Sequence, residues 1–176
     1  MKQLLQIGSF VLLSLVAACG GGSDEQTEAK TSVGKATAAG LTVELFSDAK
    51  LATGMVPLFV AVTSEASEAV TDAAVDLVPV MTMEDMKHGA PVIGTPALGD
   101  DEHYACDVVF PMASGAMATW SATVGVTRPG AAKAEVTVGP LAVEDSGRAA
   151  TFMDGERRYV ASLRGRPTGA SGLFDK

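Results

Sequence analysis

The feature that most constrains this chain is a series of short segments in which apolar residues alternate with small or polar ones. Residues 41–45 read Leu-Thr-Val-Glu-Leu, and residues 120–126 repeat the pattern from Trp120 to Val126. Side chains of a strand point alternately to its two faces, so this period of two predicts strands with one buried face. Similar segments are residues 56–62, 75–80, 104–112, 136–138 and 158–163. Glycine, proline and acidic turns separate them, which predicts an all-β antiparallel sandwich or barrel.

The N-terminus has the pattern of a secretory signal that ends in a cysteine. Lys2 is followed by a short apolar run, and residues 15–19 read Leu-Val-Ala-Ala-Cys. A basic start, an apolar stretch and small residues before a cleavage site describe a signal peptide. A cysteine at this place resembles a bacterial lipoprotein lipobox, so we expect cleavage before Cys19 and acylation of its thiol. The alternatives are an ordinary secretory signal and an uncleaved anchor.

The sequence after the cysteine predicts where the protein is held. Lipoproteins with glycine rather than aspartate after the cysteine resemble those sorted to the outer membrane, and here Gly20 follows Cys19. This implies a lipid anchor in the outer membrane, facing the periplasm. Residues 20–40 carry Gly, Ser, Thr, Ala and charge without an apolar period, which predicts a flexible tether. We therefore expect a signal peptide at 1–18, an acylated cysteine and tether at 19–40, and a β-sandwich at 41–143.

The charge of the chain disfavours negatively charged partners, and its cysteine content excludes a disulfide framework. The chain has 13 Lys+Arg against 21 Asp+Glu and a formal net charge of −8, which disfavours nucleic acid and anionic lipid surfaces as partners. It has two cysteines, and acylation of Cys19 leaves Cys106 without a partner, which excludes a disulfide framework. Cys106 shares one face of its segment with Tyr104 and Phe110, so we expect a buried, unreactive thiol.

The C-terminal part, residues 144–176, contains a weak internal repeat. Residues 53–59 and 168–174 both read T-G-x-x-x-L-F. A repeat implies a duplicated structural unit. We interpret residues 144–176 as a partial second repeat or a C-terminal hairpin, while a chance match is the alternative.

Methionine and histidine gather in the middle of the chain. Five of the eight methionines and both histidines fall between residues 81 and 117, and the densest run follows the strand-like segment 75–80. Thioethers select Cu(I), and imidazole accepts copper in either oxidation state. The candidate copper ligands are Met81, Met83, Met86, His88 and His103, with Met112 and Met117 nearby. The alternative is that methionines cap the end of the sandwich as gap fillers while His88 is a solvated loop residue.

Residues 41–126 resemble the YtkA/FixH-like family of envelope proteins. The resemblance is carried by a strand with proline, a Met/His loop, an acidic residue before tyrosine, an aromatic followed by methionine, and then glycine and tryptophan. These are Val78-Pro79, residues 86–91, residues 101–104, Phe110-Pro111-Met112, Gly115 and Trp120. The resemblance implies an Ig-like β-sandwich and an association with copper handling. Related lipoproteins open a second such module with R-Y-V-x-x-L, which residues 158–163 match.

Motifs of common enzymes are missing from the sequence. There is no H-E-x-x-H, no G-x-S-x-G and no glycine-rich phosphate loop. The acidic run at residues 100–102 lacks the spacing of a Ca²⁺ loop and is typical of a solvated turn. We therefore predict a non-enzymatic binding module with no certain cofactor and Cu(I) as the candidate ligand. A metal-free module that docks another envelope protein is the alternative, and a hydrolase using His88 or His103 is the third hypothesis.

Overall fold

The structure, a computed structural model, describes residues 29–147, 149–155 and 157–162. Over these residues the chain forms strands and no helices, in two antiparallel sheets packed face to face, so the predicted β-sandwich is confirmed. The described residues include no helix long and apolar enough to span a membrane. The signal peptide, Cys19 and the second T-G-x-x-x-L-F motif lie outside them, and the expectations there stay predictions.

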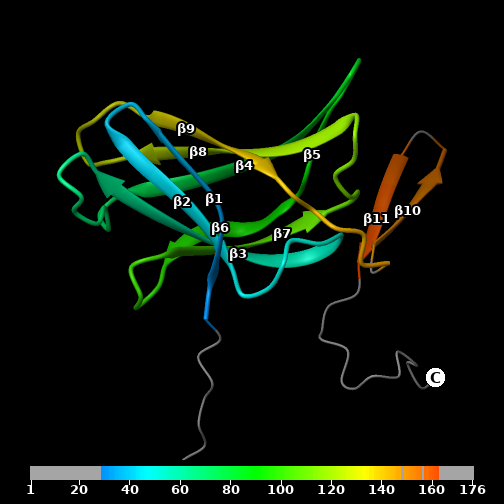
Figure 1. The fold of residues 1–176 in the computed structure, drawn as a ribbon, viewed down its shortest axis with the longest axis horizontal. Helices are drawn as coiled ribbons and strands as arrows, with labels where there is room; N and C mark the ends of the chain where they lie inside the picture. Colours follow the sequence, from blue (N-terminus) through cyan, green and yellow to red (C-terminus); the bar gives the residue numbers. More distant parts are fainter. Residues whose placement is uncertain (1–28, 148, 156, 163–176) are drawn as a thin grey trace, which may run out of the picture.

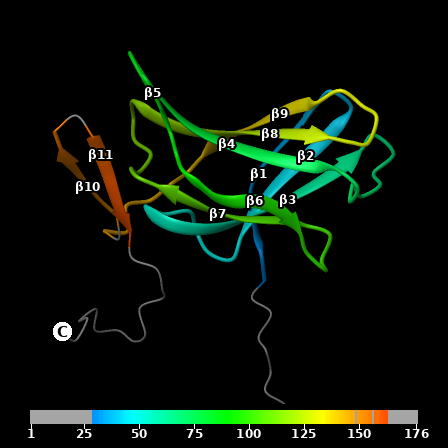
Figure 2. The ribbon, with the colours of Figure 1, turned by 180° about the vertical axis from the view of Figure 1, so that it is seen from behind.

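The two sheets hold nine strands (Figure 1). The five-stranded sheet has the order β1 (Thr31–Ala38), β2 (Leu41–Ser47), β3 (Gly54–Ser64), β7 (Tyr104–Phe110) and β6 (Val92–Leu98). The four-stranded sheet has the order β5 (Lys87–Gly89), β4 (Ala74–Met83), β8 (Ala118–Thr127) and β9 (Ala134–Leu141). Figure 2 shows the same two layers from behind, with the C-terminal hairpin beside one end of the sandwich.

The core lies between the sheets and is built by the alternating residues that the sequence pattern picks out. In β2 and β3 every second residue is buried, including Val43, Leu45 and Leu58. Burying such a side chain contributes roughly 1.5–3 kcal/mol, and these residues together hold the layers in contact. Trp120 is fully buried, its ring meets that of Phe110 edge to face at 5.1 Å, and its Nε1 donates to the Met112 carbonyl at 2.9 Å.

The first edge strand corrects the predicted tether. Residues 20–40 were expected to be flexible, but residues 31–38 form β1, which pairs with β2 through a turn at Ala39 and Gly40, both at positive φ. The tether prediction was therefore wrong over this stretch. An edge strand made of small and polar residues has no clear apolar alternation, because most of its side chains are exposed.

The C-terminal end of the sandwich is fixed to the start of β3. The Thr53 amide donates to the Glu144 carbonyl at 2.9 Å, and the Ser146 amide donates to the Thr53 hydroxyl at 3.0 Å. The sandwich thus continues to about Gly147 instead of ending at residue 143. Beyond it, β10 (Ala149–Asp154) and β11 (Arg157–Ser162) form an antiparallel hairpin of their own.

Candidate functional site

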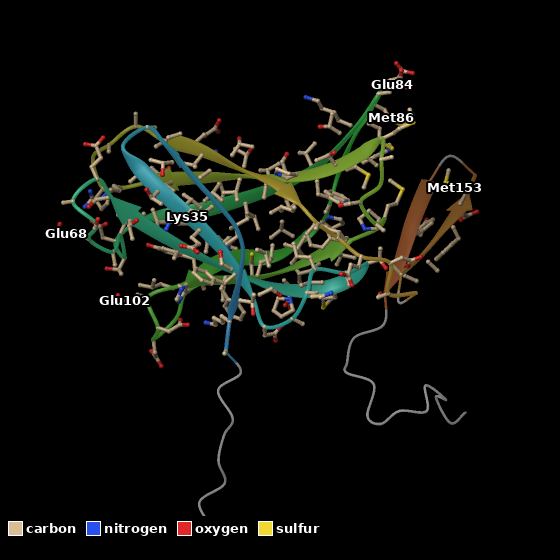
Figure 3. All side chains as sticks on the ribbon, viewed as in Figure 1. Lys35, Glu68, Glu84, Met86, Glu102 and Met153 are labelled. Atoms are coloured by element: carbon tan, nitrogen blue, oxygen red, sulfur yellow. The ribbon has the colours of Figure 1, made fainter. Side chains whose placement is uncertain are left out.

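The hairpin between β4 and β5 carries the densest part of the Met/His segment. It is the projecting tip at one end of the sandwich, where Figure 3 labels Glu84 and Met86. The Met83 amide donates to the Met86 carbonyl at 2.9 Å and closes the turn. The short β5 then pairs with the end of β4, with Met81 opposite His88 and Thr82 opposite Lys87. The turn therefore brings methionines on both sides of Glu84 to one edge of the molecule.

Three methionines surround one hollow at this end. Met83, Met86 and Met117 line a hollow of about 280 Å³ together with Glu84, Asp85 and Ala118. Ala118 pairs with Met83 in the β4–β8 register, which brings the segment before β8 beside the tip of the hairpin. Met86 is 53% exposed and Met117 is 68% exposed. Side chains this open are not explained by packing of the core.

His88 joins this group through its ring. Its Nε2 lies 3.1 Å from the Met86 Sδ, and its side chain is half-buried. A ring nitrogen beside a thioether places an intermediate donor next to a soft one. We call Met83, Met86, Met117 and His88 the methionine rim.

Met81 does not belong to the methionine rim. It is fully buried in the core, it lies opposite Trp120 in the β4–β8 register, and it does not line the hollow. Its position agrees with the alternative interpretation in which methionine fills the end of the sandwich. Met112 is likewise partly buried against the core, and its carbonyl accepts the Trp120 hydrogen bond.

His103 lies at the other end of β7 from the methionine rim. It precedes Tyr104, whereas Phe110, at the far end of the seven-residue β7, contacts Trp120. At about 3.4 Å per residue, β7 separates the two ends by roughly 20 Å. The structure therefore does not bring His103 together with the other candidate ligands.

The surroundings of His103 explain its position without a metal. Its ring meets Phe46 edge to face at 5.1 Å, and its Nδ1 lies 3.1 Å from the Asp101 carboxylate without the angle of a hydrogen bond. Lys30 also pairs with Asp101, and this hydrogen bond holds the pKa of the Asp101 carboxyl below its usual value. The group ties the start of β1 to the turn before β7.

Harder donor atoms do not gather elsewhere in the described part of the chain. Residues 29–147, 149–155 and 157–162 contain no group of three or more His, Cys, Asp or Glu placed to hold a metal ion.

Burial raises the pKa of the Cys106 thiol to about 11, and the neighbouring Asp107 adds to this effect, so the thiol stays protonated at neutral pH. The expectation that Cys106 is an unreactive, mostly buried thiol fits this environment.

The sequence placed Met117 only near the candidate site, whereas the structure places it in the hollow. The signal was its position in the polar connection before β8, which packing of a strand does not require.

Comparison of the chain with protein-family models, with curated proteins and with solved structures finds no match.

Proposed function

We propose that this protein is a non-enzymatic module that binds Cu(I) at the methionine rim. The observation that carries the proposal is the gathering of three thioethers around one hollow, with an imidazole nitrogen 3.1 Å from one of them. Sulfur ligands of this kind select Cu(I) over harder metal ions.

The residues of the rim fit the chemistry of this ion. Met83 is held by the β4–β8 pairing and His88 by the β4–β5 pairing. Met86 and Met117 lie in the connections between strands and stay exposed. Glu84 and Asp85 border the hollow, and their negative charge attracts a cation without competing as soft ligands. Copper bound at such an open rim would be accessible to a second protein, which suits delivery better than storage.

The setting that we propose is a lipid anchor at Cys19 in the outer membrane, with the sandwich facing the periplasm. The lipobox-like residues 15–19 support the anchor, and the resemblance to YtkA/FixH-like envelope proteins supports both the compartment and the ligand. The absence of enzyme motifs in the sequence supports a role in binding.

An anaerobic Cu(I) competition titration of the full chain in detergent tests the proposal. The variant Met83→Leu/Met86→Leu/Met117→Leu removes the three sulfur atoms while keeping side chains of similar volume. Met153→Leu is the matched control, because Met153 is 57% exposed but lies on β10. We expect the triple variant to lose at least about tenfold in affinity, the factor that a loss of roughly 1.4 kcal/mol in binding free energy produces. The control should bind like the parent.

Two results would count against a copper site at the rim. A parent chain that takes up no Cu(I) at micromolar concentrations would contradict copper binding by the isolated protein. A triple variant with the parent's affinity would place the site elsewhere. In the first case the exposed, adaptable side chains of Met86 and Met117 would support the metal-free docking module instead.

A further inference from the structure

We propose that Met86 and Met117 are modification sites, and that their oxidation to sulfoxides by a peroxide releases Cu(I) from the methionine rim. The release rests on the proposed function, because it concerns the same site. The oxidation itself depends only on the two side chains and the peroxide. It gives the rim a second state that methionine sulfoxide reductases reverse.

The side chains of Met86 and Met117 are the open part of the methionine rim. Met86 is 53% exposed and Met117 is 68% exposed, while Met81, on the same hairpin as Met86, is fully buried. Met83 is partly buried against the core. Figure 3 shows Met86 at the projecting tip between β4 and β5. Oxidation of sulfur follows its exposure, so Met86 and Met117 are the rim residues that a peroxide in solution reaches first.

The reaction at each sulfur needs only hydrogen peroxide as the oxidant. A lone pair of the thioether attacks one peroxide oxygen, so that an S–O bond forms and the O–O bond breaks. The second oxygen leaves as hydroxide and takes up the proton of the first, which gives one sulfoxide and one water. The sulfur loses two electrons, and the peroxide gains them.

Oxidation of Met86 changes two donors of the rim at once. The His88 Nε2 lies 3.1 Å from the Met86 Sδ, and because a thioether has no proton, the ring nitrogen is the donor in this contact. A sulfoxide oxygen is bonded to the same sulfur and accepts a hydrogen bond more strongly than a thioether does. It would therefore keep the proton on Nε2, and a protonated nitrogen cannot bind copper.

Oxidation of Met117 acts on the other side of the hollow. Met83, Met86 and Met117 line it together, so two sulfoxides leave Met83 as its only thioether among the described residues. The oxygen of a sulfoxide is a hard donor, whereas Cu(I) selects soft sulfur. The oxidised rim therefore lacks the donor set on which the proposed copper site depends.

Peroxide treatment of the full chain in detergent, without copper, tests where oxidation occurs. Peptide mass spectrometry follows each methionine. We expect Met86 and Met117 to gain oxygen about as fast as Met153, which is 57% exposed on β10. Met81 should stay a thioether until urea unfolds the chain. Equal rates at Met81 and Met86 in the folded chain would overturn the assignment of these sites.

An anaerobic Cu(I) competition titration after removal of the peroxide tests the release. We expect the oxidised parent to lose at least about tenfold in affinity, equivalent to roughly 1.4 kcal/mol, and to regain it after treatment with reductases for both sulfoxide epimers. Met153→Leu, the control, should respond like the parent. Met86→Leu/Met117→Leu should have the same affinity before and after peroxide. Met117→Leu should remain more sensitive than Met86→Leu, because only Met86 has the His88 ring beside its sulfur.

The outcomes separate this proposal from the proposed function. An oxidised parent with unchanged affinity, or a double variant as sensitive to peroxide as the parent, would overturn the release while leaving the copper site in place. A parent that binds no Cu(I) in either state would overturn the copper site and the release together. The order of oxidation is measured without copper, so the assignment of Met86 and Met117 as modification sites is decided separately.

Discussion

At the scale of the residue, Tyr104 shows how one side chain closes a connection of the sandwich. The fully buried ring lies at the start of β7, and its hydroxyl donates to the Val70 carbonyl at 3.0 Å. The same hydroxyl accepts a bond from the Ala73 amide at 3.2 Å. One oxygen therefore satisfies two backbone groups of the segment that leads into β4.

Replacing this tyrosine isolates the contribution of its hydroxyl. In Tyr104→Phe the ring stays, but the Val70 carbonyl and the Ala73 amide lose their partner. An unsatisfied buried polar group costs about 1–3 kcal/mol, so we expect a loss of this size in the free energy of unfolding by urea. Thr123→Val, which removes an exposed hydroxyl pair with Thr137, should change it far less. Equal effects of the two variants would argue that the Tyr104 hydroxyl is solvated.

The thiol of Cys106 gives a prediction that depends on pH. Burial raises its pKa from 9.0 to about 11, so at pH 8 the fraction of thiolate is about a hundredfold lower than in the unfolded chain. Native protein should therefore react with iodoacetamide far more slowly than protein in urea. Because the folded pKa lies above the unfolded one, the thiol's contribution to stability is present below pH 9 and is lost as the pH rises towards 11.

Two measurements check the behaviour of this thiol. Alkylation followed by mass spectrometry gives its rate in each state, and urea unfolding between pH 8 and 10.5 gives the stability. In Cys106→Ser the fall in stability over this pH range should be smaller than in the parent. Rapid alkylation of the native chain at pH 8 would show that the thiol is accessible and ionised.

At the scale of the element, β1 packs tightly against β9 because β1 has a glycine, Gly34, at the point of contact. A Cβ atom built on Gly34 would lie 2.8 Å from the Val138 Cγ1 and 3.1 Å from the Leu141 Cδ2. Both neighbours are buried, so neither can move away freely. The residue also lies at the point where the β1–β2 register shifts.

A larger side chain at this position should loosen the first strand. We expect Gly34→Val to cost about 1–3 kcal/mol through overpacking, measured as a lower urea midpoint and as faster hydrogen exchange in β1. Gly115→Ala is the control, because no heavy atom lies within 4 Å of a Cβ placed there. An unchanged midpoint in Gly34→Val would mean that β1 can shift away from β9 at little cost.

The turns of the β1–β2 and β10–β11 hairpins are separated by the same number of residues as the two T-G-x-x-x-L-F motifs. Gly40 is as far from Gly155 in the sequence as Thr53 is from Thr168. Both glycines lie in hairpin turns with positive φ, at +74° and +60°. This matches the interpretation of residues 144–176 as a partial second repeat, in which β10 and β11 would correspond to β1 and β2. The repeated motif at 168–174 lies outside the described residues, so the repeat stays a prediction.

At the scale of the whole molecule, the sandwich is closed before the C-terminal hairpin begins. Its last described contacts are those of Glu144, Asp145 and Ser146 with Thr53. The hairpin lies beside β3 through β11 and adds no strand to either sheet. Most of the apolar burial that stabilises the fold is therefore complete at Gly147.

A chain that ends at Gly147 should keep this stability. We expect its thermal midpoint at low protein concentration to lie within about 4 °C of the parent's, the shift produced by less than roughly 1 kcal/mol in a domain of this size. Trp120 fluorescence will follow unfolding, because the indole is fully buried in the core of the sandwich. Ending the chain at Leu141 instead should destabilise it strongly, since Val143 and the contacts with Thr53 are then lost. Loss of cooperative unfolding at Gly147 would show that the hairpin belongs to the same folding unit.

The sequence by itself determined the class of fold, because strand periodicity is local and the apolar residues at every second position of segments such as 41–45 and 120–126 are all buried. It also supplied the residue types of the candidate copper site. Only the tertiary structure separated Met81 and His103 from Met83, Met86 and His88, and only it brought Met117 beside them. Local pattern carries no information about which ends of two strands meet in a sandwich. The strand β1 was missed because small residues at an edge need not alternate. Strand pairing decides which residues form β1 and which side chains share the methionine rim, since it joins segments that are distant in sequence.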